Sequence, residues 1–268
     1  MLHLKSIQIQ TVPAGKADSF PFNIPALQAA DEVVFTSPVT FLVGENGSGK
    51  STLLEAIALE ASMIAVGSEN LDRDRTISAA SPLSDSLRLI WQLKTRKGFF
   101  LRAEDFFGYV KRLAQMRAEL QQDLKRVEEE YADRSTFAQN QARLAYQSEL
   151  HGMNQQYRRA LDDFSHGESF LELFQSRFTP GGLYLLDEPE VPLSPSRQLT
   201  FISMLKQMVE QDCQFIIATH SPILMAFPGA VILSFDETPL QPVSYDSLEH
   251  VTLTRSFLND PDQYLRYL

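Results

Sequence analysis

The sequence predicts an α/β protein with a mostly parallel core sheet, an antiparallel β layer and an inserted α-helical lobe. Three observations carry this prediction. Apolar runs alternate with helical segments in the second half of the chain, which is typical of βαβ units. Apolar and polar residues alternate near the amino terminus. A long proline-free segment has apolar residues at helical spacing. We expect one domain over residues 1–268, with the helical lobe at 105–163.

The composition fits one large domain. The chain has 268 residues, of which 44% are hydrophobic, enough for a single α/β core. Its formal net charge of −10 argues against a basic surface for non-specific DNA binding, although a local basic patch stays compatible with it. Cys213 has no partner cysteine and is predicted to be a buried strand thiol. With no apolar run long enough to span a membrane and no leader at Met1–Lys5, we expect a cytoplasmic protein.

The first elements lead into a glycine-rich loop. Leu2–Thr11 alternates apolar and polar residues and Glu32–Phe35 repeats this character, so both are expected as strands of the antiparallel layer. Val39–Val43 is largely apolar and is predicted to be the strand that feeds the loop Gly44–Thr52. The helix-like segment Leu53–Ser62 follows.

The helical lobe is predicted from a segment without proline between Phe106 and Phe164. Apolar residues recur there at steps of three and four, which predicts helices at about Asp105–Ala132 and Thr136–Asp163. Charges of both signs are interleaved along the first helix. This pattern favours a solvated surface, with a nucleic-acid or partner surface as the alternative.

Strands and helices alternate again in the second half of the chain. Leu183–Leu186, Gln214–Ala218 and Val231–Phe235 are predicted to be strands, and Ser196–Gln211 a helix between the first two. Short apolar strands separated by helices indicate a parallel sheet. Ligands of such sheets bind at the carboxyl ends of the strands.

The loop after the strand Val39–Val43 matches a phosphate-binding P-loop. Its residues are Gly44, Glu45, Asn46, Gly47, Ser48, Gly49, Lys50, Ser51 and Thr52. The glycines let backbone N–H groups converge on phosphate oxygens where a Cβ would block them. Lys50 adds a charge for the β and γ phosphates, the Ser51 hydroxyl is a candidate Mg²⁺ ligand, and the next helix directs its N-terminus at the same anion. The sequence therefore predicts a nucleoside triphosphate site.

Two acids end the apolar strand that begins at Leu183. Asp187 is predicted to hold the Mg²⁺ as a Walker B acid, and Glu188 to accept a proton from attacking water. Two adjacent acids divide this work, because one neutralises the metal while the other polarises the nucleophile.

A second anion site is predicted at Ser165-His166-Gly167-Glu168-Ser169, and Ser169–Arg177 is predicted to continue as a helix. A serine and a tight glycine turn at a helix N-terminus direct a hydroxyl and free N–H groups the same way. Taken alone, the segment also fits an ordinary helix cap.

The order of these motifs resembles that of the ABC-type ATPases: P-loop, helical lobe, signature, then the apolar strand ending in Asp187-Glu188. The usual signature is Leu-Ser-Gly-Gly-Gln, so Ser165 and Gly167 match while His166 and Glu168 depart from it. The Ser-His-Gly-Glu form is similar to stand-alone, AAA-like predicted ATPases, which also resemble the heads of SMC and DNA-repair ATPases. The resemblance covers nearly the whole chain and implies a P-loop NTPase fold of the ABC-ATPase type.

The resemblance gives a role to the strand end at Thr219-His220-Ser221. His220 looks like the switch histidine of the family, which reaches the γ-phosphate and the attacking water. The remaining histidines that we considered, His3, His151 and His250, have no comparable setting.

Other parts of the family pattern stay open. The glutamine that approaches the Mg²⁺ in the family has two candidate equivalents, Glu104, which could act through water, and Gln92. Leu193 and Ser194 come closest to the usual D-loop. The aromatic residue that stacks on adenine is not assigned, and Phe20 and Phe22 are candidates for which core packing is the alternative.

By resemblance, two copies of the chain bind ATP between them, because the signature of one subunit closes over the phosphate held by the other. The resemblance implies Mg²⁺-dependent hydrolysis of ATP to ADP and phosphate by a head-to-tail homodimer, with Lys50, Glu188 and His220 at the reaction. We expect a cytosolic switch that acts with an effector protein or nucleic acid and does not insert into a membrane. The alternatives are the nucleotide-binding subunit of an ABC transporter and a weakly hydrolysing ATP-binding scaffold.

Overall fold

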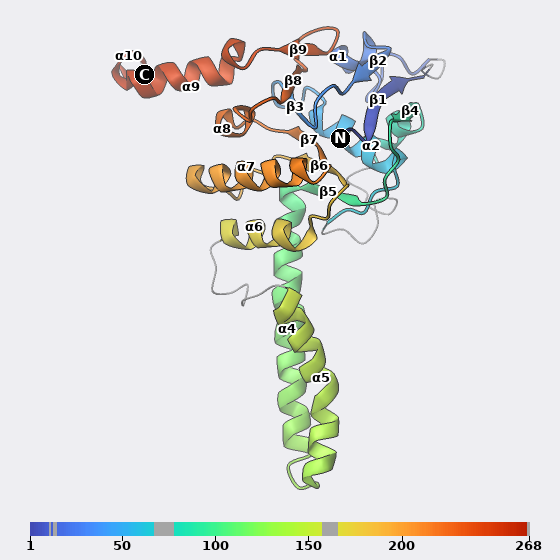
Figure 1. Cartoon of the computed structure of the whole chain (residues 1–268), viewed down its shortest axis with the longest axis vertical. Coiled ribbons are helices and arrows are strands. Elements are labelled where there is room, and N and C mark those ends of the chain that lie inside the picture. Colours follow the sequence, from blue (N-terminus) through green and yellow to red (C-terminus); the bar gives the residue numbers. More distant parts are fainter. Residues whose placement is uncertain (11, 13–14, 67–77, 157–165, 267–268) are drawn as a thin grey trace. The chain divides into compact units, whose positions relative to one another are not determined.

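The computed structural model describes residues 1–10, 12, 15–66, 78–156 and 166–266 (Figure 1). The chain forms two compact units, which we describe separately. Unit 1 contains Met1–Ala103 and Phe178–Leu268, and unit 2 contains Glu104–Arg177. No described helix is long and apolar enough to cross a membrane.

The centre of unit 1 is a six-stranded sheet with the order β5-β6-β7-β3-β8-β9. Its strands are β5 (Gly98–Arg102), β6 (Leu183–Asp187), β7 (Gln214–Ala218), β3 (Val39–Val43), β8 (Val231–Ser234) and β9 (Gln241–Val243). The first five are parallel and β9 pairs antiparallel with β8. All residues of β3, β6 and β7 are buried, which explains their continuous apolar runs. The predicted parallel core is confirmed.

An antiparallel sheet of three strands forms the second β layer, in the order β2-β1-β4. Its strands are β1 (Leu4–Ile9), β2 (Glu32–Val34) and β4 (Leu87–Trp91). The first two were predicted, whereas β4 was not. β4 pairs with a strand about 80 residues earlier, Ile9 opposite Leu87, so no local hairpin signal marks it.

One buried side chain joins the two sheets. The amide oxygen of Gln214, on β7, accepts hydrogen bonds from the backbone N–H groups of His3 and Leu4, both at 2.8 Å. Its amide nitrogen donates to the carbonyl oxygen of Leu4 at 2.9 Å. Gln214 is fully buried, and these three bonds satisfy the polar group inside the protein.

Helix α2 (Lys50–Glu60) follows the P-loop and contacts strands of both sheets. Its buried residues Leu53, Leu54, Ala56, Ile57 and Ala58 belong to the hydrophobic core with residues of both sheets. The remaining helices of unit 1 are α1 (Pro25–Gln28), α3 (Ser81–Ser84), α7 (Pro195–Glu210), α8 (Pro222–Met225), the 3₁₀ turn η3 (Tyr245–Ser247), α9 (Glu249–Asn259) and α10 (Pro261–Leu265). Most begin with proline in the first turn, where its missing N–H has no helical partner to lose.

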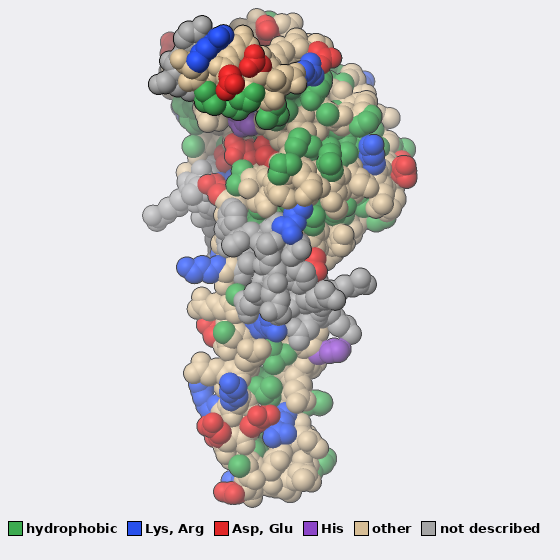
Figure 2. All heavy atoms as spheres, turned by 90° about the vertical axis from the view of Figure 1, so that its left-hand side faces the viewer, with side chains coloured by type: hydrophobic (Ala, Val, Ile, Leu, Met, Phe, Trp, Pro, Cys, Tyr) green, Lys and Arg blue, Asp and Glu red, His purple; other side chains and the backbone are tan. Residues whose placement is uncertain are grey.

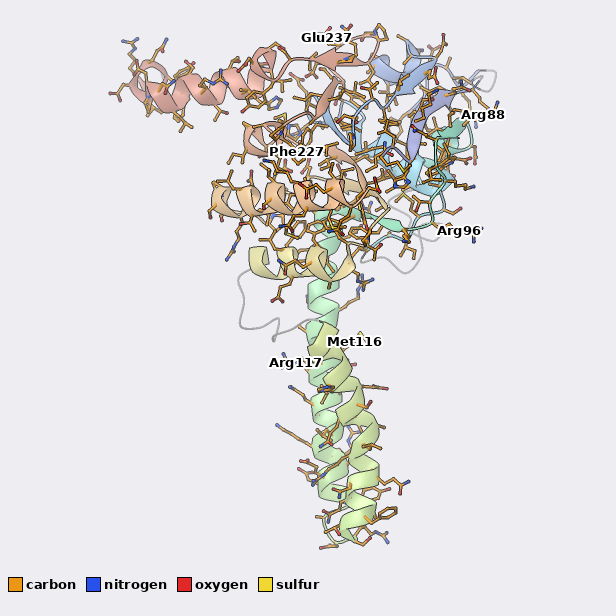
Figure 3. The ribbon with its side chains drawn as sticks, in the orientation of Figure 1. Arg88, Arg96, Met116, Arg117, Phe227 and Glu237 are labelled. Atoms are coloured by element: carbon orange, nitrogen blue, oxygen red, sulfur yellow. The ribbon has the colours of Figure 1, made fainter. Side chains whose placement is uncertain are left out.

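Unit 2 consists of helices. The long helix α4 begins at Ala103 and ends at Glu130, α5 spans Thr136–Gln156 and α6 spans His166–Arg177. An ion pair of 3.3 Å between Arg143 and Glu128 joins α5 to α4. In Figure 3 the neighbours Met116 and Arg117 point to different sides of α4, as the turn of an α-helix requires. The predicted starts of the two long helices, Asp105 and Thr136, lie within two residues of the starts of α4 and α5.

The face of the molecule drawn in Figure 2 carries dispersed charges. Figure 2 shows Lys and Arg side chains scattered over one face rather than gathered in a stripe, which agrees with the net charge of −10. Cys213 is buried immediately before β7, as predicted.

Candidate functional site

The predicted chemical groups of unit 1 lie at one edge of the parallel sheet. The carboxyl end of β3 leads into the P-loop, β6 ends at Asp187, and β7 leads to His220. The register places Asp187 opposite Ala218, and Ala218 opposite Leu42. Parallel strands end at the same edge, so residues from distant parts of the sequence meet there.

The P-loop has glycines where the backbone and its surroundings require them. Gly44 has φ of 144°, and Gly49, which caps α2, has φ of 106°; both values favour glycine. A Cβ on Gly49 would lie 2.8 Å from side-chain carbons of Ile24. The loop therefore closes tightly at the N-terminus of α2, whose first N–H groups have no partner inside the helix.

Lys50 is folded back on its own loop. Its ammonium group donates to the carbonyl oxygens of Gly44 at 2.7 Å and Glu45 at 2.8 Å. Burial lowers the pKa of Lys50, and the nearby carboxylates, with Glu188 and Asp187 the largest contributions, act in the opposite direction. A cation is held inside the loop that the sequence identified as a phosphate cradle.

Ser51 and Asp187 lie together, as a shared metal site requires. The Ser51 hydroxyl donates to Asp187 Oδ1 at 3.1 Å. Burial raises the pKa of Asp187 to about 7, and the hydrogen bond from Ser51 opposes this rise. A hydroxyl and a carboxylate are ligands that Mg²⁺ accepts together with phosphate oxygens and water. The described parts of the chain contain no group of three or more His, Cys, Asp or Glu that could hold a metal ion.

Glu188 has a left-handed backbone conformation with φ of 51°, unusual for a residue with a side chain. A hydrogen bond of 2.9 Å from its N–H to the carbonyl of Ala218 holds it there. Its side chain is 42% exposed, and its Oε1 lies 4.0 Å from His220 Nε2. The strained turn directs one acid outward while Asp187, one residue earlier, stays buried.

His220 is held by two neighbours. Its backbone N–H donates to Glu190 Oε1 at 2.7 Å, and its Nδ1 lies 3.2 Å from Nε2 of His250. Its Nε2 is buried and has no hydrogen-bond partner among the described residues. Burial lowers the pKa of His220, and the charges of Lys50 and His250 lower it further. A neutral imidazole with an unused nitrogen can orient water or contact a phosphate.

His250 corrects one expectation from the sequence. We expected no setting for it comparable with that of His220, yet it lies on α9 against the His220 ring, with the ring centroids 5.2 Å apart. The two residues are 30 positions apart, and only the path of the chain after β8 brings them together.

The sequence interpretation also missed Glu190 and Asp236. Glu190 supports the backbone of His220, and burial raises the pKa of its carboxyl group. Asp236 follows β8 and accepts the backbone N–H of Glu45 at 2.9 Å, which ties it to the P-loop. A signal for Asp236 was present, because an acid directly after an apolar core strand is the pattern that identified Asp187.

The structure resolves part of what the sequence left open. Gln92 lies beyond β4, where its N–H donates to the carbonyl of His3, on the antiparallel layer rather than at the P-loop edge. Glu104 belongs to unit 2, near the start of α4. Phe22 is buried in the core, whereas Phe20 is 54% exposed.

The predicted signature is described only in part. Ser165 lies outside the described residues, and Gly167 lies in the first turn of α6. The helix begins at His166, three residues earlier than the expected Ser169. This start places the predicted glycine inside the helix N-terminus.

Comparison with known sequence families gives two matches. Residues 79–226, more than half of the chain, match the family described as "AAA domain, putative AbiEii toxin, Type IV TA system". The chain belongs to this AAA-domain family. Residues 23–61, which include the P-loop, match a second family described as "AAA domain". The chain thus contains an AAA domain of the P-loop ATPase type, and its P-loop lies within the second match.

Solved structures similar to this AAA domain share little sequence with it. The Smc head domain from Pyrococcus furiosus, solved with an extended coiled coil and bound to the C-terminal domain of ScpA, has a TM-score of 0.47 at 10% identity, covering 96% of this chain and all of the other. The SMC head domain from Thermotoga maritima has a TM-score of 0.41 at 15% identity, covering 91% of this chain and all of the other. CbiO1 of Clostridium perfringens, part of the ABC transporter complex cbiONQ, has a TM-score of 0.45 at 14% identity, with both chains covered completely.

Proposed function

We propose that this AAA domain hydrolyses ATP with Mg²⁺ between two copies of the chain, and that the cycle switches an effector protein or a nucleic-acid complex in the cytoplasm. The observation that carries the proposal is the meeting of Lys50, the Ser51–Asp187 pair, Glu188 and His220 at one edge of the sheet. Each has the chemistry that phosphoryl transfer to water needs.

The residues divide the reaction between them. Lys50 exchanges its hydrogen bonds to the loop carbonyls for hydrogen bonds to the β and γ phosphates. The new bonds are stronger because both partners are charged. Ser51 and Asp187 would hold Mg²⁺, which neutralises phosphate charge when bound. Glu188 takes a proton from water, and its exposed carboxylate suits a group that meets solvent. His220 directs Nε2 toward the same water or the γ-phosphate.

The dimer follows from the signature segment. We propose that Ser165, Gly167 and the N-terminus of α6 supply donors to a phosphate of the nucleotide bound to a second copy of the chain. One P-loop and one signature per chain then make two composite sites in a symmetric pair. Loss of the γ-phosphate removes contacts to both copies and allows them to separate. Glu104 remains our candidate for a water-mediated contact to the Mg²⁺ in this assembly.

The test uses the variant Glu188→Gln beside the wild type. Phosphate release from MgATP is expected to fall by roughly 10²- to 10⁴-fold in the variant, the usual contribution of a general base. Light scattering at micromolar concentration is expected to show a dimer for Glu188→Gln with ATP and a monomer without it. Lys50→Ala is the matched control, since it should neither bind ATP nor dimerise.

Two outcomes would overturn the proposal separately. Equal phosphate release by Glu188→Gln and the wild type would remove Glu188 as the base. If Glu188→Gln stayed monomeric at saturating ATP, the proposed site between two copies would be wrong, while the proposal that the chain binds ATP would stand. Purification from native cells then identifies the partner, because a permease would indicate the transporter alternative.

A further inference from the structure

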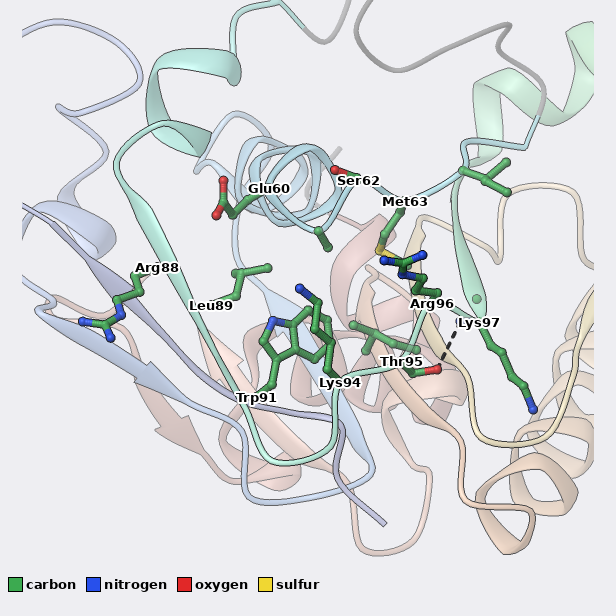
Figure 4. Close-up of a pocket in the computed structure, with 14 residues that line it drawn as sticks. Glu60, Ser62, Met63, Arg88, Leu89, Trp91, Lys94, Thr95, Arg96 and Lys97 are labelled. Carbon is green, nitrogen blue, oxygen red and sulfur yellow. Dashed lines mark hydrogen bonds between the residues drawn. The ribbon is translucent and has the colours of Figure 1, made fainter.

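Unit 1 contains a cavity away from the P-loop edge (Figure 4). Its volume is about 600 Å³, within the range of roughly 300–1,000 Å³ typical of small-molecule sites. It is lined by the end of α2, by β4 and by the connection between β4 and β5. Because α2 begins in the P-loop at Lys50 and its last residue, Glu60, lines the cavity, the two sites lie at opposite ends of this helix.

The cavity is lined by more cations than anions. Arg88, Lys94, Arg96 and Lys97 line it, with Glu60 as the one carboxylate among its lining residues. In a chain with a net charge of −10, such a local excess of positive charge is unusual. Cations gathered around a cavity raise the local concentration of anionic ligands.

Three of these cations have their charged groups available. Within the part of the chain that the structure describes, no carboxylate forms an ion pair with Arg88, Lys94 or Arg96. All three are exposed, and Figure 3 shows Arg88 and Arg96 at the surface of unit 1. Figure 4 shows that the Arg88 side chain is directed away from Trp91, so its charge lies at the outer side of the cavity. The Lys97 amine donates to the carbonyl of Pro180 at 3.1 Å and is therefore partly engaged.

The wall of the cavity also carries Trp91, the single tryptophan of the chain. It lies on β4 and is half-buried, and Lys94 lines the same cavity from the connection that follows β4 (Figure 4). An indole face accepts the stacking of any base, and neighbouring cations accept the phosphates on either side of it. A small anion such as phosphate would need no aromatic residue here.

We propose that this cavity binds a nucleotide unit of single-stranded nucleic acid, with a base against Trp91, phosphates at Lys94 and Arg96, and Arg88 as a further positive charge at the outer side of the cavity. Helix α2 ends at the cavity with Glu60 and its negative pole, so the phosphates lie on the side of the three free cations rather than against Ala61. This proposal rests on the proposed function in that it gives single-stranded nucleic acid as the partner of the ATPase, but binding at the cavity does not require ATP hydrolysis. A free nucleotide has the same chemistry and is the alternative source of the ligand.

The experiment reads binding from Trp91 itself. A Lys50→Ala background is used so that nucleotides do not occupy the P-loop, and the full chain is titrated with a 15-residue oligothymidine without ATP. Tryptophan emission is expected to be quenched to saturation, with a Kd that rises between 50 and 200 mM salt because phosphates are neutralised. The combined variant Arg88→Gln, Lys94→Gln and Arg96→Gln is expected to bind at least ~30-fold more weakly.

A second variant tests the stacking contact. Trp91→Phe, followed by anisotropy of a labelled oligothymidine, is expected to keep salt-dependent binding and to weaken it by roughly 5-fold or more, as loss of a strong stacking partner does. The matched charge control, Lys16→Gln with Lys125→Gln and Lys206→Gln, removes three exposed cations elsewhere and should bind nearly as the parent does.

The outcomes decide the proposal and the ligand. Thymidine monophosphate that binds as tightly as the oligomer would support the site with a free nucleotide as its ligand. Tryptophan emission unchanged by both ligands, or equal losses in the cavity variant and the charge control, would overturn the proposal. Oligomer binding in the Lys50→Ala background leaves this site standing even if the proposed ATPase activity fails.

Discussion

His220 Nδ1 lies 3.2 Å from His250 Nε2, so the side chain at the end of β7 and the terminal helix α9 share a contact. This contact fixes the ring of His220 through one nitrogen and leaves Nε2 toward Glu188. His250, which does not contact the proposed reacting groups, thus determines that Nε2 of His220 is the nitrogen that faces them.

Replacement of His250 by alanine is expected to change the pH dependence of hydrolysis. His250 contributes to the lowered pKa of His220, after burial and Lys50, so its removal raises that pKa. The acid limb of the kcat profile should therefore move to higher pH, so that kcat falls on the acid side while kcat at pH 7 and above, and KM, change little, because burial and Lys50 still keep the pKa of His220 low. His151→Ala on α5 is the control, and an unchanged pH profile for His250→Ala would contradict the positioning role.

Asp187 is expected to make the metal-free protein less stable as the pH rises. Its pKa is raised from 3.8 to about 7 in the folded state, so the folded chain binds an extra proton between these values. Stability from this group is full below pH 4 and is lost up to pH 7, at up to about 1.4 kcal/mol per pH unit. Urea unfolding in EDTA at several pH values should show this loss in the wild type relative to Asp187→Asn. A constant difference between the two proteins from pH 4 to 8 would refute the shift.

Gly98 is expected to tolerate no side chain. Its φ is 120°, and a Cβ would lie 1.7 Å from the backbone oxygen of Leu183 on the paired strand. Gly98→Ala should lower the free energy of unfolding by several kcal/mol or prevent soluble expression. Gly152→Ala is the matched substitution, since nothing lies within 4 Å of its Cβ in α5, and it should stabilise by up to about 1 kcal/mol. A soluble Gly98→Ala variant with the Tm of the wild type would show that β5 and β6 lie further apart than the structure has them.

Asp236 is expected to support nucleotide affinity through the backbone of the P-loop. Asp236→Ala removes the acceptor of the Glu45 N–H, and ATP affinity should fall about 10-fold, in line with one lost charged hydrogen bond. Asp236→Asn keeps an oxygen at this place and should lose much less. Calorimetry with a non-hydrolysed ATP analogue measures both, and equal affinity of the alanine variant and the wild type would exclude this role.

Local patterns explain which parts of the fold and site were predictable. β3, β6 and β7 are buried throughout, so continuous apolar runs identify them in the sequence. The polar residues at the carboxyl ends of two of these runs, Asp187 and His220, then identify the edge of the sheet where the site lies. The contact of His220 with His250 and the left-handed turn at Glu188 arise from packing between distant segments. No local pattern encodes such contacts, which is why His250 was passed over while Asp187 was found.

The hydrogen bonds between Gln214 and Leu4 join residues 210 positions apart. A ribosome adds roughly 5–20 residues per second, so Gln214 is synthesised roughly 10–40 s after Leu4. The rest of β1 pairs with β2 and β4, which are synthesised much earlier, but the backbone groups of His3 and Leu4 must wait through this interval for their buried partner. The amino-terminal end of β1 is thus tied to the parallel sheet only late in translation.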